Sequence, residues 1–181
     1  KVNTIADGTA VKTPGETIFP YIRENLDEII TVADDELIVA FLDMVENHKM
    51  VVENSGLLTV AALRHLGVKD KRVVSILSGG NMDVITMSSV VQQGLIFRDR
   101  IFTVSVLLPD KPGELSKVAE TIAKVQGNVI KLEHNQFVST NRNAAVELRI
   151  TLEAFGTEHK KQIMEALEKD GYKPKLVRTN L

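Results

Sequence analysis

The stretch VELRITLE, residues 146–153, decides the fold of the second half of the chain. Valine, leucine and isoleucine alternate strictly with charged and polar residues, which is the pattern of a strand with one buried face and one face in water. Residues 101–108 alternate in the same way, with Thr103 and Ser105 between larger apolar side chains. We therefore predict two half-buried strands, at 101–108 and 144–153.

Helical and extended segments alternate around these strands. Apolar residues recur at helical spacing between Asp110, a candidate N-cap, and Gly127. Thr157 is placed to cap a second helix that stops at Gly171. The remaining predicted elements are strands at 128–137 and 172–178 and a polar hairpin loop at 139–143. The order strand–helix–strand–strand–helix–strand over about 80 residues predicts a ferredoxin-like βαββαβ fold.

The first half of the chain is organised around VVSILSGGN, residues 73–81. An apolar run without charge predicts a strand buried on both faces, as in a parallel sheet. Ser78 would lie at the carboxyl end of that strand, where open α/β sheets place their ligands. A second buried strand is predicted at 28–32, with helices at 17–24, 33–48, 57–66 and 82–93. This alternation predicts a parallel α/β layer up to about residue 95, followed by a charged linker at 98–100.

Composition and charge exclude several classes of function. The chain of 181 residues has room for one domain or two small ones, and its net charge of −2 gives no sign of a nucleic-acid or anionic-membrane partner. It has no cysteine, which excludes disulfides and thiolate metal sites and fits a cytoplasmic protein. No apolar run reaches the ~20 residues of a membrane helix, and the four histidines lack metal-ligand spacing. We therefore expect neither a membrane segment nor a metal site.

Four motifs, in the same order, resemble those of threonine dehydratases (threonine ammonia-lyases). They are TIADGTAVKTPG at residues 4–15, KMVVENSG at 49–56, ILSGGNMD at 76–83 and LPDKPGEL at 108–115. The last of them resembles the opening motif of an ACT domain. The resemblance implies a pyridoxal-phosphate (PLP) lyase of fold type II, the tryptophan-synthase-β-like fold. Residues 1–97 would be the C-terminal part of its catalytic domain, and residues 98–181 an ACT regulatory domain.

The enzyme implied by this resemblance converts L-threonine to 2-oxobutanoate and ammonia, and also acts on L-serine. Such an enzyme serves isoleucine biosynthesis or threonine catabolism, and we expect it in the cytoplasm. The family's Schiff-base lysine, its glycine-rich phosphate loop and its metal-binding carboxylates would all lie upstream of Lys1. Neither Lys12 nor Lys49 matches that lysine. We therefore assign no catalytic residue in this chain and expect its 181 residues by themselves to be inactive.

Three residues match cofactor-binding positions of the family. Ser78 matches the serine whose hydroxyl bonds the pyridine nitrogen of PLP. A neutral hydroxyl does not hold this nitrogen protonated as a carboxylate would, which suits elimination of water. Gly8 matches a glycine whose backbone borders the ring, and Glu53 an acidic residue beside the polar edge of the ring. As purely structural residues, Ser78 would be a helix N-cap, Gly8 part of a turn and Glu53 a surface carboxylate.

Three further residues match the effector site of ACT domains, which bind an amino acid. Asp110 and Gly113 lie in the predicted strand-to-helix loop, and Asn128 begins the next strand. A helix N-terminus suits the carboxylate of the effector, and Asp110 suits its ammonium group. The structural alternative is that Asp110 merely caps the helix and that Asn128 is merely the residue at which the chain leaves the C-cap at Gly127. Edge-to-edge pairing of ACT sheets predicts a homo-oligomer.

Two other functions remain open at this point. The chain would be a stand-alone amino-acid-binding ACT module if residues 1–97 were vestigial, or it would belong to a related PLP-dependent serine racemase or dehydratase. The sequence does not distinguish isoleucine, valine or another amino acid as the effector, nor inhibition from activation. If residues 1–97 are a piece of a larger sheet, we expect them to be less stable than the ACT half.

Overall fold

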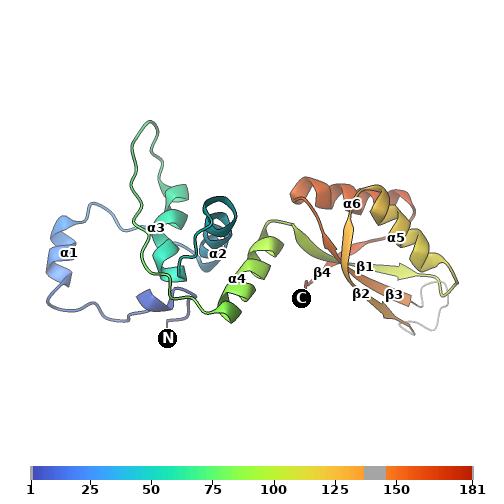
Figure 1. Cartoon of the computed structure of the whole chain (residues 1–181), viewed down its shortest axis with the longest axis horizontal. Helices are drawn as coiled ribbons and strands as arrows, with labels where there is room; N and C mark the ends of the chain where they lie inside the picture. The colour runs from blue at the N-terminus through green and yellow to red at the C-terminus, as the bar shows by residue number, and fades with distance from the viewer. Residues whose placement is uncertain (1, 137–145, 181) are drawn as a thin grey trace. The chain divides into compact units, whose positions relative to one another are not determined.

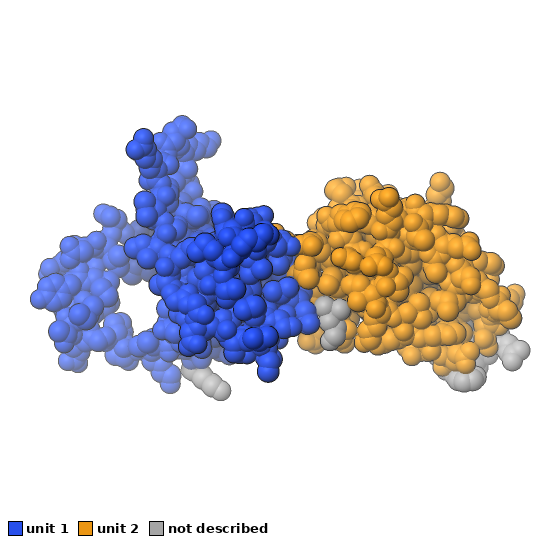
Figure 2. All heavy atoms as spheres, in the orientation of Figure 1, with its two compact units in different colours: residues 1–94 blue, residues 95–181 orange. Residues whose placement is uncertain are grey.

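The computed structural model describes residues 2–136 and 146–180, and the chain separates into two compact units (Figure 2). The first unit comprises residues 1–94 and the second residues 95–181. Each unit has its own cluster of buried apolar side chains. Each therefore has the interior of a small domain.

The second unit is an antiparallel sheet with two helices on one face (Figure 1). Its strands are β1 (Ile101–Leu108), β2 (Asn128–Asn135), β3 (Val146–Glu153) and β4 (Lys175–Val177), in the order β2-β3-β1-β4. The helices are α5 (Glu114–Lys124) and α6 (Thr157–Lys169). Every neighbouring pair of strands is antiparallel. The predicted order of strands and helices is confirmed, and it forms a ferredoxin-like βαββαβ sheet.

Alternation along β1 and β3 places one face of the sheet against the helices. Val104, Leu148 and Ile150 are at most 1% exposed, and they belong to the same cluster as Ile122 of α5 and Ile163 of α6. Burying one such side chain stabilises the fold by roughly 1.5–3 kcal/mol. A slip of one residue in either strand would turn these side chains to the other face, so the core also fixes the register.

Two caps predicted in this unit are wrong. Asp110 is not the N-cap of α5, because that position is occupied by Gly113 with φ of 88° and no side-chain hydrogen bond caps the helix. Glycine adopts this left-handed conformation without the penalty that a Cβ brings, so a backbone turn sets the helix start. Thr157 is the first residue of α6 rather than its cap, and its hydroxyl donates to Asp99 Oδ2 (2.9 Å).

Several element ends also differ from prediction. α5 ends at Lys124, before Gly127, because Gln126 has φ of 62° and turns the chain out of the helix. β4 covers only residues 175–177 of the strand predicted at 172–178. The hairpin loop predicted at 139–143 lies outside the described residues.

The first unit is built from short helices around a small core. They are α1 (Phe19–Asn25), α2 (Asp34–Asp43) with a π-turn at Met44–His48, α3 (Leu58–Ala61) between 3-10 turns at Asn54–Leu57 and Ala62–His65, and α4 (Val84–Phe97). Leu37 and Phe41 of α2 are buried with Val52, Leu57 and Val90 in one cluster. The four predicted helices are therefore present, with ends that differ by a few residues.

The two strands predicted in this unit do not form. Residues 28–32 and 73–77 are unpaired, and Ile29, Val74 and Ile76 are 75%, 89% and 73% exposed. A strand needs a neighbour for its backbone hydrogen bonds, and none of the described residues before Gly94 lies in a strand. The α/β class is confirmed, with an antiparallel sheet, but the buried parallel strand expected to end at Ser78 is an exposed extended segment.

Within residues 2–136 and 146–180, no helix has both the length and the apolar character that a membrane crossing requires. In the same ranges, no group of three or more His, Cys, Asp or Glu side chains is arranged to hold a metal ion.

Candidate functional site

Three segments that are far apart in the sequence meet at Glu53. The backbone N–H of Glu53 donates to the Gly79 carbonyl (3.3 Å), and its carboxylate Oε2 accepts from the Asn81 N–H (3.2 Å). Gly8 approaches the same carboxylate, since a Cβ added to Gly8 would lie 3.9 Å from Glu53 Oε1. The structure therefore brings Gly8 and Glu53 to the turn that follows Ser78.

This close approach requires glycine at two positions. A Cβ on Gly79, whose φ is +76°, would overlap the Glu53 carboxylate. A Cβ on Gly56 would overlap the backbone carbonyl of Ser78. Any side chain at either position pushes the segments at Glu53 and Ser78 apart, so these glycines set the spacing of the site as well as its turns.

Ser78 is not a helix N-cap. The helix that follows, α4, begins at Val84, and its first N–H groups are bound by Asp83: Oδ1 accepts from Ile85 (2.9 Å) and from Thr86 (3.0 Å). Hydrogen bonds from the Thr86 side chain and backbone hold the pKa of Asp83 below its ordinary value. The capping interpretation of Ser78 is therefore excluded, and its hydroxyl, on an exposed turn, has no role in the start of α4.

Two residues without a predicted site role hold the loop that carries Gly8. Asp34, at the start of α2, accepts hydrogen bonds from the Thr4 hydroxyl (2.5 Å) and the Ile5 N–H (3.1 Å). Asn54 Nδ2 donates to the Ile5 carbonyl (3.1 Å). From the sequence, Asp34 is predicted only to be an acidic residue in the first turn of a helix. Its hydrogen-bond partners lie 29 and 30 residues away in the chain, and no local sequence pattern indicates them.

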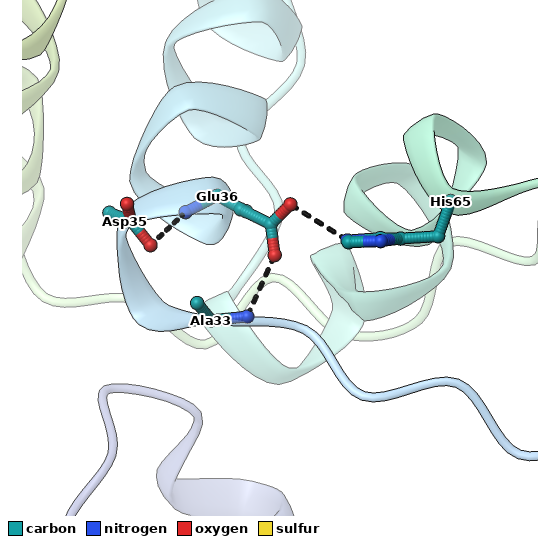
Figure 3. Close-up of polar contacts among 4 residues, drawn as sticks. All are labelled: Ala33, Asp35, Glu36 and His65. Carbon is teal, nitrogen blue, oxygen red and sulfur yellow. Dashed lines mark hydrogen bonds and ion pairs between the residues drawn. The ribbon is translucent and has the colours of Figure 1, made fainter.

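A second set of contacts holds the start of α2 (Figure 3). Glu36 Oε2 accepts from the Ala33 N–H (2.9 Å), Glu36 Oε1 lies 2.7 Å from His65 Nε2, and Asp35 Oδ1 accepts from the Glu36 N–H (3.1 Å). The Ala33 N–H, and then His65, keep the pKa of Glu36 below its ordinary value. The contact between Glu36 and His65 therefore joins the start of α2, which positions Asp34, to the 3-10 turn at residues 62–65.

Two buried polar atoms next to Glu53 have no hydrogen-bond partner among the described residues. They are Asn54 Oδ1 and Ser55 Oγ, and the second lies 2.9 Å from where a Gly8 Cβ would be. The backbone carbonyl of Ser78 lies against Gly56, the residue after Ser55. A serine hydroxyl is able to donate to or accept from a ring nitrogen without adding charge. Two orphaned polar atoms, a carboxylate and a glycine backbone in one small area, next to a serine, fit the polar edge of an aromatic cofactor. The residues present therefore fit the pyridine edge of PLP.

A cleft with a volume of about 460 Å³ opens beside this cluster. Glu53, Asn54 and Asn81 line it from one side, and Asp83 and Thr86 line it from the start of α4. Of the three predicted cofactor residues, Glu53 alone lines the cleft; Gly8 and Ser78 do not.

The second candidate site is a cleft at the turn between β1 and α5. Its volume is about 330 Å³, and both Asp110 and Gly113 line it, as predicted for an effector site. His134 and Gln136, at the end of β2, also line it. The sequence did not indicate that these two residues line the cleft. Their position depends on the pairing of β2 with β3, which places the end of β2 near this turn.

Asn128 does not belong to this cleft. Strand register pairs Asn128 with Glu153 and Glu153 with Ile101, whereas Leu108 pairs with Val146. Asn128 therefore lies at the end of the sheet opposite Asp110, roughly 23 Å away at 3.3 Å per residue. Its amide donates to Glu153 Oε2 (3.0 Å).

Comparison with known proteins identifies a family and relatives that this chain resembles. Residues 1–79 match the family described as "Pyridoxal-phosphate dependent enzyme". L-threonine ammonia-lyase of Geobacter sulfurreducens is 37% identical over 171 residues, which are 93% of this chain and 42% of that protein. L-threonine ammonia-lyase of Thermotoga maritima is 32% identical over 175 residues, or 96% of this chain and 44% of that protein.

Among solved structures, a threonine deaminase of T.th. is 38% identical, with a TM-score of 0.40, over 45% of this chain and 30% of that chain. The chain spans less than half the length of the curated relatives it matches. PLP is thus the cofactor of the family that residues 1–79 match. Residues 1–79 therefore match the pyridoxal-phosphate dependent enzymes, and the chain is similar over most of its length to the L-threonine ammonia-lyases.

Proposed function

We propose that this chain is part of a PLP-dependent L-threonine ammonia-lyase, with residues 1–97 in the catalytic domain and residues 98–181 as an ACT regulatory domain. The observation that carries this proposal is the meeting of Gly8, Glu53 and the turn after Ser78 in one small area. Each comes from a different motif shared with threonine dehydratases. The whole enzyme converts L-threonine to 2-oxobutanoate and ammonia, and L-serine is its second substrate.

When bound, PLP supplies the electron sink that amino-acid elimination requires. The residues of this chain hold one edge of it. Ser78 would bind the ring nitrogen through a neutral hydroxyl, which would keep positive charge off that nitrogen. Glu53, itself held by the Asn81 and Gly79 backbones, orients the turn that carries Ser78. Gly8 lets its backbone approach Ser55 and Glu53, since a Cβ there would lie 2.9 Å from Ser55 Oγ, and that backbone would border the ring.

Neither lysine considered in the sequence lies in this cluster. Lys49 Nζ donates to the Glu46 carbonyl (2.6 Å) at the end of the π-turn, and Lys12 is exposed. We therefore propose that the purified 181-residue chain releases no ammonia from threonine, since an amine nucleophile is needed to hold the cofactor. Threonine-dependent ammonia release above a no-protein control would contradict this.

The test of the cofactor role uses the full-length enzyme. Ser78→Ala is expected to lower 2-oxobutanoate formation by about 100-fold and to change the visible absorbance of the bound cofactor. Ser75→Ala is the matched control: it lies three residues earlier in the same segment, and its hydroxyl makes only a long contact to the Thr59 carbonyl (3.5 Å). Equal effects of both substitutions, or wild-type absorbance in Ser78→Ala, would contradict the proposal.

The same assay separates the related alternatives. A serine racemase would interconvert the two enantiomers of serine with little release of ammonia, whereas the proposed enzyme releases ammonia from threonine. The cytoplasmic location and the metabolic role, in isoleucine biosynthesis or threonine catabolism, stay predictions.

We further propose that an amino acid binds between two copies of the ACT domain. Asp110 and Gly113 lie at one end of the sheet and Asn128 at the other, so one chain does not bring them together. A two-fold pair with antiparallel edges would set Asp110 of one copy next to Asn128 of the second. This arrangement supports a homodimer with two equivalent effector sites.

Calorimetric titration with isoleucine, valine, threonine and serine, alongside a mass measurement in solution, tests this site. Asp110→Ala and Asn128→Ala should each abolish binding. Mixed after unfolding and refolding together, the two variants should recover about a quarter of the wild-type stoichiometry, because each heterodimer regains one intact site. A mixture that recovers no binding would place both residues in one chain's site or in none.

A further inference from the structure

The face of the second unit's sheet that carries no helix has a small polar cavity. Its volume is about 40 Å³, and its lining includes Thr103 of β1, Lys131 of β2, Arg149 and Thr151 of β3, and Arg178 just after β4. Register explains the gathering: Lys131 pairs with Thr151, Thr151 with Thr103, and Thr103 with the residue before Arg178. The cavity is therefore lined by β1, β2, β3 and the segment that follows β4.

The floor of this cavity has an unused hydrogen-bond donor. Thr103 and Thr151 are 6% and 4% exposed, and their hydroxyl oxygens lie 2.9 Å apart. Two hydroxyls have two donor hydrogens, and their mutual bond uses one of them. Neither hydroxyl has a further partner among the described residues. A buried donor without an acceptor is unfavourable, so the floor favours a ligand that accepts hydrogen bonds.

The walls of the cavity also supply donors and positive charge. Arg149 Nε lies 3.1 Å from Glu147 Oε1, which leaves its two terminal nitrogens free to bind a ligand. No carboxylate in the described part of the chain pairs with Arg178. Lys131 is 2.9 Å from Glu133, the single acidic residue of the lining. With Glu147 counted beside Arg149, three cations and two anions leave one excess positive charge at a site rich in donors.

We propose that this cavity binds a phosphate-type oxyanion, either free phosphate or the terminal group of a phosphomonoester. Arginine side chains bind such groups through paired N–H donors, and the spare threonine hydroxyl adds a donor from below. A volume of 40 Å³ is room for about three waters. The cavity therefore holds the oxyanion group alone, and any remaining part of the ligand lies over the open face of the sheet. This site is separate from the amino-acid cleft at the β1–α5 turn.

Titration of the 181-residue chain with inorganic phosphate, in low-salt buffer free of phosphate, tests the proposal. We expect saturable binding with Kd of about 1 mM, weakened by added sodium chloride. Arg178→Ala should weaken it about tenfold, since it removes a charge-assisted pair of hydrogen bonds. Thr103→Val, which keeps the branched shape and removes the hydroxyl, should weaken it about threefold. Thermal melting of each variant checks that the sheet is intact.

Lys175→Ala is the matched control. Lys175 pairs with Ser105 on the same face of the sheet but does not line the cavity, so its removal changes the charge of the face without touching the site. Phosphate affinity should then change less than about twofold. Equal losses in Arg178→Ala and Lys175→Ala would mean general attraction to a positive face and would overturn the proposal. So would the absence of saturable binding up to about 20 mM phosphate.

A parallel titration with glycerol 3-phosphate identifies the source of the oxyanion. Equal affinity for the two compounds means that the site binds free phosphate as well as any phosphomonoester. Tighter binding of the phosphomonoester means that the rest of the ligand contacts the open face. In either case, the proposal requires that Arg178→Ala weaken binding about tenfold.

Discussion

Similar apolar segments are buried in the second unit of this chain and exposed in the first. Val104, in β1, is fully buried, whereas Val74, in the apolar run before Ser78, is 89% exposed. Both segments are rich in branched residues that favour strands. β1 has β3 and β4 as neighbours, and residues 73–77 have none among the described residues. Strand propensity alone therefore does not bury a segment; a paired neighbour and a covering layer do.

The largest effect on stability is expected from one member of a matched pair of valine substitutions. Val104→Ala removes two methyl groups from a closed core and should lower the free energy of unfolding of the second unit by about 2.5 kcal/mol. Val74→Ala, at 89% exposure, should change stability by less than about 0.5 kcal/mol. Chemical denaturation followed by circular dichroism measures both. Equal effects would mean that residues 73–77 are buried in solution.

A matched pair of glycines tests the cofactor cluster against the effector turn. Gly79 and Gly113 both have positive φ, at 76° and 88°. A Cβ on Gly113 meets nothing within 4 Å, whereas one on Gly79 overlaps the Glu53 carboxylate. Gly113→Ala should therefore cost about 1 kcal/mol of backbone strain, and Gly79→Ala about 2 kcal/mol because Glu53 must also move.

Hydrogen exchange at the Glu53 and Asn81 amides reports the second effect directly. Both N–H groups are bound within the cluster, to the Gly79 carbonyl and to the Glu53 carboxylate. Their exchange should accelerate in Gly79→Ala and stay unchanged in Gly113→Ala. Unchanged exchange in both variants would show that the cluster adapts to a side chain.

Lowering the pH should reduce the folding stability of both units, and a different carboxylate is responsible in each. The Ser105 hydroxyl, and then Arg149, lower the pKa of Glu147 in the second unit, as the Ala33 N–H lowers that of Glu36 in the first. A lowered folded-state pKa contributes stability above the ordinary value of 4.5, and this is lost as pH falls through the lowered value. Glu147→Gln should flatten the pH dependence of melting below this value.

Glu36→Gln is the corresponding variant of the first unit. Its amide oxygen is still able to accept from the Ala33 N–H, so the helix start is kept while the ion pair with His65 is lost. Thermal melting between pH 3 and pH 6 should show a flatter acid limb for the first unit alone. A change in the second unit's transition would mean that the two units unfold together.

The smallest expected effect compares two buried hydroxyls. Ser55 Oγ has no partner among the described residues, so Ser55→Ala should leave stability unchanged or raise it by up to about 1 kcal/mol. Thr121, 4% exposed, donates to the Lys117 carbonyl and contacts Asp170. Thr121→Val should lower stability by about 1 kcal/mol. A destabilising Ser55→Ala would indicate a partner for this hydroxyl, and loss of activity in the full-length enzyme would link it to the cofactor.

Sequence patterns predicted the α-helices and the βαββαβ order, because these depend mainly on residues close in the chain. The alternation at 146–153 predicted β3 to its last residue, and helical spacing predicted α5 and α6. The four motifs predicted the family, which the relatives and the match over residues 1–79 confirm. They also named Gly8, Glu53 and Ser78 together, but not that Glu53 holds the turn after Ser78.

The tertiary structure decided what depends on residues far apart in the chain. Asp83, and not Ser78, binds the first N–H groups of α4, and Gly113 replaces Asp110 at the start of α5. Asn128 is separated from Asp110 by the length of the sheet, because β1 and β2 run in the same direction on either side of β3. The cavity proposed to bind an oxyanion joins side chains from β1, β2, β3 and the segment after β4. Such placements follow from strand pairing and packing across the fold, which local spacing does not encode.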